Sequence, residues 1–132
     1  MFTSDVKIKF HDCDPAGILF YANIFKLSHD IYQELLESIK DRNFFDDESI
    51  ALPIIKATAE YFSPMKSGDV LSTNIIVSQL NDSSFELTNL FYDRIKKLHA
   101  EVKTVHVAVD KSDFKKTALP MELVELLRAN RV

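Results

Sequence analysis

A single long amphipathic segment, residues 23–40, most constrains how this chain folds. Its apolar side chains recur at steps of three and four, and polar side chains take the opposite side. The apolar set is Ile24, Leu27, Ile31, Leu35 and Ile39, widened by Tyr32 and Leu36, and the polar set is Lys26, Asp30, Gln33, Glu34 and Glu37. This period predicts an α-helix of about five turns with one wide buried face.

Most of the remaining chain alternates between apolar and polar residues, which is typical of strands with one wet face. The predicted strands are residues 6–11 (Val6, Ile8 and Phe10 on one face), 55–61, 71–77, 85–91 and 99–109 (Val105, Val107 and Val109 on one face). Pro120 introduces a short C-terminal helix, residues 121–130. Short polar turns indicate an antiparallel meander. The order β-α-β-β-β-β-α predicts one α+β domain, residues 1–132, with the sheet curled around the long helix.

The charge and cysteine content exclude several classes of protein. A net charge of −4 argues against a nucleic-acid partner, which favours a basic surface. Cys13 is the only cysteine, so no disulfide framework is expected and a reducing compartment is the simpler interpretation. The first residues lack the apolar core of a signal peptide, and no apolar run approaches the roughly 20 residues of a membrane span. We therefore expect a cytoplasmic protein.

An acidic cluster, Asp12-Cys13-Asp14, lies between the first predicted strand and the long helix. Asp14 has two possible roles. It is either an N-cap of the helix, a position that Asp fills well, or a catalytic carboxylate. The second role uses the same location, because unpaired N–H groups at a helix start can hold the oxyanion of an acyl transfer. Pro15 indicates that the chain turns here, so Asp14 is preferred, and Asp12 is interpreted either as structural or as a support for the catalytic carboxylate.

Other chemistries are less well supported by the sequence. Cys13 could be a nucleophile activated by His11 or His106, but a lone cysteine in an apolar neighbourhood is more often a small core residue. The histidines, at positions 11, 29, 99 and 106, show no ligand spacing, so we expect no metal site. Only Gly17 and Gly68 are available, so neither a P-loop nor a dinucleotide-binding motif is present.

The stretch "DCDPAGILFYANIF", followed by the amphipathic helix, resembles the acyl-CoA thioesterases of the hydroxybenzoyl-CoA thioesterase type, which have the hotdog fold. The motif there reads roughly D-x-D-x-x-G with aromatic residues and Asn following, and it is matched by Asp12, Asp14, Gly17, Phe20, Tyr21 and Asn23. A weaker similarity extends through "IKATAEYFSPMKSGDVL" to "LPMELVELL", so the resemblance covers most of the chain.

The resemblance implies roles for the motif residues. Asp14 is the catalytic carboxylate, as nucleophile or general base, and the backbone N–H of Tyr21 holds the thioester oxygen. Gly17 lets the turn pass close to the substrate, while Phe20 and Asn23 contact it. Members of the family are dimers or tetramers with sites at subunit interfaces, and Phe44 and Phe45, in an otherwise polar loop, are candidates to line a shared pocket. No cofactor is implied, because coenzyme A is part of the substrate.

Two departures from the family pattern bear on substrate binding. Many relatives carry His where Tyr21 stands and Tyr where Ile24 stands, so any role of that His is missing. Some members also have a basic cluster in the turn that is Asn81-Asp82-Ser83 here. The nucleotide of coenzyme A is then either held by Lys66, Arg94, Lys96 or Lys97, which are otherwise ordinary solvated residues, or it is exposed to solvent.

The leading hypothesis is hydrolysis of a small or medium acyl-CoA or aroyl-CoA thioester. An acyl-carrier-protein thioesterase is a close alternative, since the basic residues are few. A non-catalytic protein that binds acyl thioesters needs no Asp14, and a hydratase usually requires a catalytic His that this motif lacks.

Overall fold

The computed structural model describes residues 1–40 and 42–131. The elements are β1 (Phe2–Lys7), a 3₁₀ turn η1 (Phe10–Asp12), α1 (Asn23–Glu37), β2 (Ile50–Ala51), β3 (Ile54–Tyr61), β4 (Val70–Leu80), β5 (Ser84–Tyr92), β6 (Leu98–Val107), β7 (Val109–Asp110) and α2 (Met121–Ala129). No helix in these described ranges is long and apolar enough to cross a membrane.

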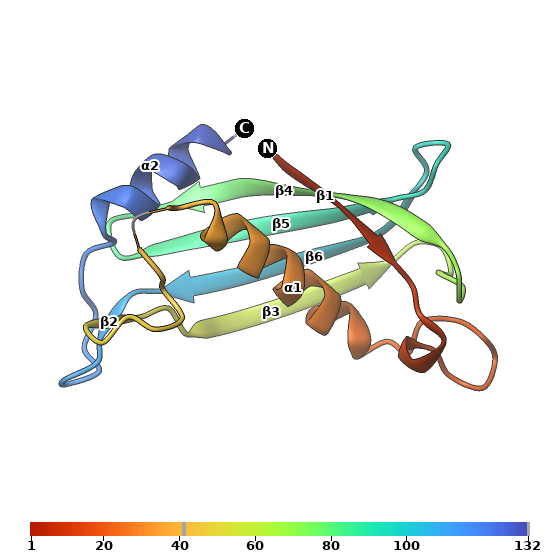
Figure 1. Cartoon of the computed structure of the whole chain (residues 1–132), viewed down its shortest axis with the longest axis horizontal. Helices are drawn as coiled ribbons and strands as arrows, with labels where there is room; N and C mark the ends of the chain where they lie inside the picture. Colours follow the sequence, from red (N-terminus) through yellow and green to blue (C-terminus); the bar gives the residue numbers. More distant parts are fainter. Residues whose placement is uncertain (41, 132) are drawn as a thin grey trace.

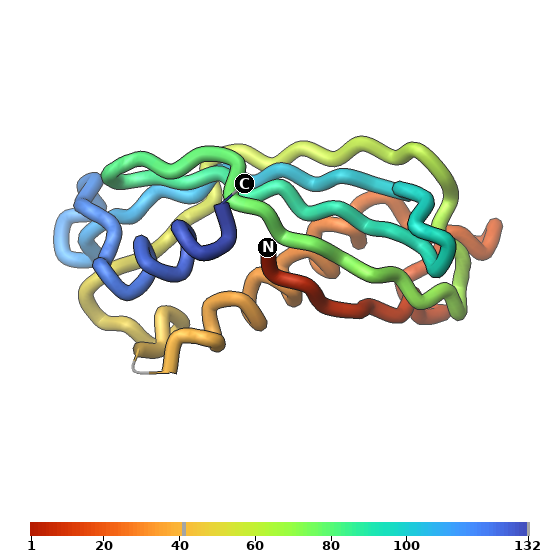
Figure 2. Tube along the Cα trace, turned by 90° about the horizontal axis from the view of Figure 1, so that it is seen from above, coloured from red at the N-terminus to blue at the C-terminus, as the bar shows by residue number. Residues whose placement is uncertain are grey.

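A five-stranded antiparallel sheet in the order β1-β4-β5-β6-β3 forms one layer, and α1 lies across its face (Figure 1). Figure 2 shows the same two layers after a turn of 90°. Strands β4, β5 and β6 form the predicted meander, while β1 and β3 are the edges. The α+β prediction is confirmed, and the arrangement is the hotdog fold that the resemblance implies.

The helix α1 follows the predicted pattern closely but is shorter than expected. Ile24, Leu27, Ile31 and Leu35 are buried against the sheet, which confirms the predicted apolar face. The helix ends at Glu37 rather than near Lys40. At this end Ser38 donates both its backbone N–H and its hydroxyl to the carbonyl of Leu35, so the carbonyl is satisfied locally and the helix is not continued.

The first strand was placed wrongly by the sequence pattern. It covers Phe2–Lys7, paired with β4, instead of residues 6–11. Beyond it the Asp12 carboxylate accepts the Lys9 N–H at 3.1 Å, and the Asp12 N–H donates to the Lys9 carbonyl at 2.9 Å. These local contacts fold the chain into η1 and compete with strand pairing. Phe10 is consequently 86% exposed, although the alternation placed it beside buried Ile8.

The face of β6 (Leu98–Val107) that packs against the core is not the face that carries Val105 and Val107. In β6 the residues opposite Phe85, Asn89 and Phe91 of β5 are His106, Val102 and Ala100. Directly opposed residues share a face of the sheet, so these three join the core side. Val105 and Val107 alternate to the other side, and Val109 belongs to β7, which pairs with β2.

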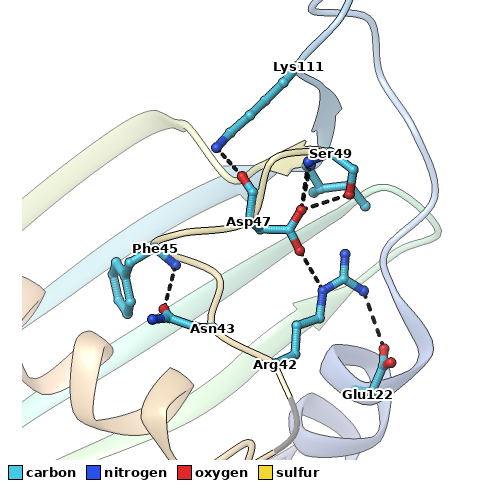
Figure 3. A network of polar contacts seen from close by, with 8 residues as sticks. Arg42, Asn43, Phe45, Asp47, Ser49, Lys111 and Glu122 are labelled. Atoms are coloured by element: carbon cyan, nitrogen blue, oxygen red, sulfur yellow. Dashed lines mark hydrogen bonds and ion pairs between the residues drawn. The ribbon is translucent and has the colours of Figure 1, made fainter.

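The loop after α1 is fixed by a polar network (Figure 3). Asp47 accepts hydrogen bonds from Arg42 at 2.6 Å and from the Ser49 N–H at 2.8 Å, and Lys111 donates to the Asp47 carbonyl. Arg42 also lies 3.6 Å from Glu122 of α2. Hydrogen bonds from Ser49 and Arg42 hold the pKa of Asp47 well below its usual range. The network ties the loop to β7 and α2.

The two phenylalanines of this loop have different environments. Phe44 is buried in the core beneath the guanidinium of Arg42, which lies 5.0 Å from its ring centre, whereas Phe45 is exposed. Both line a hollow at the C-terminal end of α1, and within one chain they lie away from Asp14.

Candidate active site

Asp14 begins a tight turn that its own side chain stabilises. The Gly17 N–H donates to the Asp14 carbonyl and the Ala16 N–H donates to Asp14 Oδ1, each at 2.9 Å. Pro15 suits the second position of such a turn, and Gly17 has a φ of +81°, which glycine adopts without strain. The Asp14 side chain therefore caps this turn and not a helix. The N-cap of α1 is Ala22, which has no side-chain cap, so the helix-cap interpretation of Asp14 is wrong.

One oxygen of the half-buried Asp14 carboxylate is left for other partners. Oδ1 accepts the Ala16 N–H, while Oδ2 accepts no hydrogen bond from residues 1–40 and 42–131. The backbone geometry thus holds the carboxylate in place with one oxygen free to meet a substrate or a water molecule.

The backbone at the start of α1 presents unpaired donors. The Asn23 N–H donates to the Phe20 carbonyl at 2.9 Å, but the N–H of Tyr21 finds no acceptor in the described part of the chain. The Tyr61 hydroxyl, from the edge strand β3, donates to the Tyr21 carbonyl and holds this segment against the sheet. Tyr21 itself is 67% exposed. The unpaired N–H lies at the positive end of the α1 dipole, where negative charge is favoured.

The structure brings three of the predicted site residues into one open groove of about 560 Å³. Asp14, Phe20 and Tyr21 line it together with Tyr61 and Phe62, and its other walls are Ile18, Leu19, Ser63, Pro64 and Met65. The groove is largely apolar, and Asp14 lines it together with Tyr21, whose N–H has no acceptor among the described residues. Such a set of groups can polarise a carbonyl and attack it or activate water beside it.

Asn23 does not line the groove. Its side chain donates to the backbone carbonyl of Asp12 at 2.8 Å, and the same carbonyl accepts the Phe20 N–H at 3.0 Å. Asp12 is 3% exposed, with its carboxylate on the Lys9 N–H. Asp12 and Asn23 thus join the end of η1 to the start of α1 and fix the segment between them. These contacts of Asp12 are those of a structural residue, one of the two roles that the sequence allows.

The predicted cationic residues lie at the same end of the sheet as Asp14 but outside its groove. Lys66 is exposed in the loop before β4, and its backbone pairs with Ile18 of the Asp14 turn. Lys96 and Lys97 lie in the turn between β5 and β6. His99 connects the two loops, with its ring nitrogens 3.1 Å from the Pro64 carbonyl and 2.9 Å from the Asp93 carboxylate.

Cys13 has the environment of a structural thiol. Burial and the nearby carboxylates of Asp12 and Asp14 raise its pKa, which disfavours the thiolate that a nucleophile needs. Its Sγ lies 3.5 Å from the Lys9 carbonyl, and neither His11 nor His106 hydrogen-bonds to it in the described structure. Over the same residues, no group of three or more His, Cys, Asp or Glu is placed to hold a metal ion.

A second cavity, of about 110 Å³, lies between α1 and the sheet and was not predicted from the sequence. Its walls are Phe25, Ser28, His29, Tyr32, Ile54, Ala57, Ile75, Leu87, Asn89, Thr104 and His106. Burial lowers the pKa of His106 to about 4, so its ring is neutral at neutral pH. A signal was present in the sequence, because Asn89 interrupts the apolar face of Phe85, Leu87 and Phe91.

Comparisons with known proteins bear on the family and the fold of the chain. The sequence model of the thioesterase-like superfamily matches residues 8–127. A 1,4-dihydroxy-2-naphthoyl-CoA hydrolase of Nostoc punctiforme is 35% identical over 134 residues, which cover 98% of this chain and 88% of the relative. The crystal structure of a 1,4-dihydroxy-2-naphthoyl-CoA thioesterase from Synechocystis matches with a TM-score of 0.89 and 25% identity, over 96% of this chain and 95% of that one. A gentisyl-coenzyme A thioesterase, at 23% identity and a TM-score of 0.82 over 93% of this chain and 99% of that one, shares the fold.

Proposed function

Because the chain belongs to the thioesterase-like superfamily, we propose that it is an acyl-CoA thioesterase that hydrolyses an aromatic acyl-CoA to the free acid and coenzyme A. The observation that carries the proposal is that Asp14 and Tyr21 line one groove, and that the Tyr21 N–H has no acceptor among the described residues. The aromatic acyl group follows from the substrates named for the relatives in Nostoc punctiforme and Synechocystis.

Asp14 supplies the base or the nucleophile. Its free Oδ2 either takes a proton from water as the water oxygen attacks the thioester carbon, or attacks that carbon itself to form an anhydride that water then opens. In both routes the C–S bond breaks, the thiolate leaves and takes up a proton, and the acid is released. Thiols have pKa values near ~8.5, so the thiolate leaves without a strong general acid. A histidine partner for Asp14 is therefore unnecessary.

The Tyr21 N–H is the hydrogen-bond donor that polarises the thioester carbonyl. As the carbonyl carbon is attacked, its oxygen gains negative charge, and the N–H at the start of α1 can donate to it. Tyr61 positions this donor by holding the Tyr21 carbonyl, and Gly17 allows the tight turn that sets Asp14 beside it. Phe20 contributes apolar surface to the same groove, whereas Asn23 acts by holding the segment in place.

The edge strand β3 supports a dimer. Among the described residues it pairs with β6 alone, every residue of it except Ala59 is exposed, and the exposed residues include Ile54, Ile55 and Tyr61. An open apolar edge of this kind is a template for pairing with a second copy. Antiparallel pairing along the full strand sets Tyr61, a wall of the Asp14 groove, opposite Ile54 of the partner subunit, a wall of the second cavity. Two such sites per dimer would each use both chains, and a tetramer can form from two dimers.

The nucleotide end of the substrate is assigned to the loops at the Asp14 end of the sheet. Lys66, Lys96 and Lys97 are exposed there, and Arg94 lines a shallow hollow beside them. Asp69 and Asp93 line the same hollow, which reduces its attraction for phosphates. For this reason an acyl-carrier-protein substrate is the second candidate. We place the protein in the cytoplasm, in keeping with the free thiol of Cys13.

A panel of thioesters tests the proposal. Purified protein is mixed with aromatic and aliphatic acyl-CoA esters, the matching pantetheine thioesters and an acyl-carrier-protein thioester, and thiol release is followed. The proposal expects turnover of aromatic acyl-CoA esters, with a lower KM for the CoA ester than for its pantetheine analogue. Turnover only on the carrier-protein ester would favour the second candidate, and no turnover on any ester would refute both.

A further inference from the structure

His99, near the start of β6, lies between two loops and contacts both of them with its ring. Nδ1 is 3.1 Å from the Pro64 carbonyl oxygen, and Nε2 is 2.9 Å from the Asp93 carboxylate. The His99 carbonyl also accepts the backbone N–H groups of Phe62 and Ser63, at 2.8 and 3.2 Å. The residue is 8% exposed, so water has little access to these contacts. His99 therefore joins the loop after β3 to the turn between β5 and β6.

The loop on the Pro64 side supports the turn that carries Asp14. Pro64 and Met65 belong to the wall of the Asp14 groove. The Met65 carbonyl accepts the N–H of Leu19, at 2.7 Å, where the chain leaves the Asp14 turn. Because the His99 ring holds Pro64, a movement of the ring is passed on to the wall of the groove and to the base of this turn.

The Asp93 carboxylate, on the other side of the ring, also organises the turn between β5 and β6. Its Oδ1 accepts the N–H groups of Ile95 and Lys97, at 3.0 and 2.9 Å, and its Oδ2 faces His99 Nε2. These hydrogen bonds, that with His99 foremost, lower the pKa of Asp93, so the carboxyl group is ionised at neutral pH. Asp93 therefore accepts a proton from the ring side and has none to donate.

The two partners of the ring decide how many protons the ring needs. A peptide carbonyl and an ionised carboxylate only accept hydrogen bonds, and a neutral imidazole has only one N–H. Both contacts of His99 are therefore hydrogen bonds only when the ring carries two protons. A neutral ring keeps its proton on Nε2, because a hydrogen bond to a carboxylate is about twice as strong as one to a neutral acceptor. The lone pair of Nδ1 then faces the Pro64 carbonyl, and this contact is lost.

A positively charged ring is accommodated at this position. The ionisable side chains that share a hollow of about 400 Å³ with the ring are Asp69, Asp93 and Arg94. The segment 62–65 and residues 70–71 of β4, which lie on the other sides, contain no ionisable side chain. The imidazolium thus has one carboxylate in contact and a second one in the same hollow, as a largely buried charge requires.

We propose that His99 is a positioning residue, whose doubly protonated ring fixes the Pro64 wall of the Asp14 groove, and that turnover falls as the second proton is lost with rising pH. This inference rests on the proposed thioesterase function. A misplacement of about 1 Å at a catalytic site can cost about 100-fold in rate, so the loss of one supporting hydrogen bond is expected to lower kcat about tenfold.

The variant Asp93→Asn tests the proposal because it removes the need for the second proton. The new amide oxygen can still accept the N–H groups of Ile95 and Lys97, while the amide NH2 donates to Nε2 of a neutral ring, which then donates from Nδ1 to Pro64. The kcat on an aromatic acyl-CoA ester is measured from about pH 5 to about pH 8, the interval in which histidine normally titrates. As the pH rises we expect kcat to fall about tenfold in the wild type and to stay high in Asp93→Asn.

Two histidine variants complete the kinetic test. His99→Gln should have a low kcat that does not depend on pH, and circular dichroism shows whether it is folded. His11→Gln is the matched control, since it makes the same change at an exposed histidine and should keep the wild-type pH profile. A wild-type kcat that does not fall with pH, an equal fall in Asp93→Asn, or a fall that disappears in His11→Gln would overturn the proposal.

Nitrogen NMR of the histidine rings tests the same contacts without turnover and separates this inference from the proposed function. We expect the neutral His99 ring to be the Nε2–H tautomer in the wild type and the Nδ1–H tautomer in Asp93→Asn. The Leu19 amide signal should shift with the titration of His99 in the wild type and stay constant in Asp93→Asn. The same tautomer in both proteins, or a Leu19 signal that is independent of the ring, would overturn the inference. The expected signals without hydrolysis of any ester would support the role of His99 in holding the groove and refute only the proposed function.

Discussion

The buried imidazole of His106 makes the stability of this protein depend on pH between neutrality and pH 5. His106 is fully buried, and burial, with a smaller effect from the charge of His29, lowers its pKa from 6.5 to about 4. The folded state therefore binds the proton more weakly than the unfolded state. Stability contributed by the neutral ring is complete above the unfolded pKa and is lost as the pH falls from about 6.5 towards about 4.

The size of the effect follows from the two pKa values. With 1.36 kcal/mol per pKa unit, the free energy of unfolding falls by about 2 kcal/mol between pH 7 and pH 5, and by at most about 3 kcal/mol at lower pH. Asp47, Asp93 and Asp110, whose pKa values lie below the usual range, lose their stabilising contributions only below about pH 4. The interval from pH 7 to pH 5 therefore excludes the contributions of these three carboxylates.

Urea denaturation of the wild type and His106→Gln at pH 7 and pH 5 measures this contribution. Gln keeps polar atoms at the position but has no group that titrates, so its free energy of unfolding is expected to fall by about 2 kcal/mol less than that of the wild type over this interval. Equal decreases in the two proteins, or no decrease in the wild type, would refute the assignment of the effect to His106.

Three further variants test the groups around the groove. Tyr61→Phe removes the hydrogen bond to the Tyr21 carbonyl and should lower kcat about tenfold with KM nearly unchanged, as expected for a residue that positions the oxyanion donor; an unchanged kcat argues against that role. Asn23→Ala removes one of the two hydrogen bonds to the Asp12 carbonyl and should lower the free energy of unfolding in urea by about 1 kcal/mol, as well as lowering kcat; if neither quantity falls, the positioning role is contradicted. Replacing Lys96 and Lys97 together by Ala should raise KM several-fold at constant kcat, and added salt should do the same to the wild type. If KM changes neither in the double variant nor with added salt, the carrier-protein substrate is favoured.

The sequence correctly predicted the elements whose apolar pattern results from packing against a single surface. In α1 the apolar stripe from Ile24 to Leu35 faces one sheet, so its period of three and four residues carries through into the structure. Phe85, Leu87 and Phe91 of β5 are buried for the same reason. The bounds of β1 were missed because the Asp12 carboxylate binds the Lys9 N–H, a local contact that the alternation of apolar residues does not reveal.

The groove and the cavity differ in how far the sequence could predict them. Asp14 and Tyr21 lie in one continuous motif, so their proximity was predictable from the resemblance. The grouping of Tyr32, Asn89 and His106 depends on the register of β5 with β6 and on the packing of α1 over both strands. Nothing in the spacing of these three residues along the chain encodes that contact. Asn89, a polar residue on an apolar face, was the one visible sign.

The central claim, that Asp14 carries out the hydrolysis, is tested most directly by single-turnover kinetics of Asp14→Asn on an aromatic acyl-CoA ester. The amide oxygen of Asn can still accept the Ala16 N–H, so the turn and the melting temperature should be preserved, whereas the side chain can no longer attack or take a proton. The hydrolysis rate is expected to fall by about 10²–10⁴. Asp12→Asn keeps an oxygen for the Lys9 N–H and serves as the neighbouring control, with a much smaller loss expected. Full turnover by Asp14→Asn, or loss of turnover only in Asp12→Asn, would contradict the account.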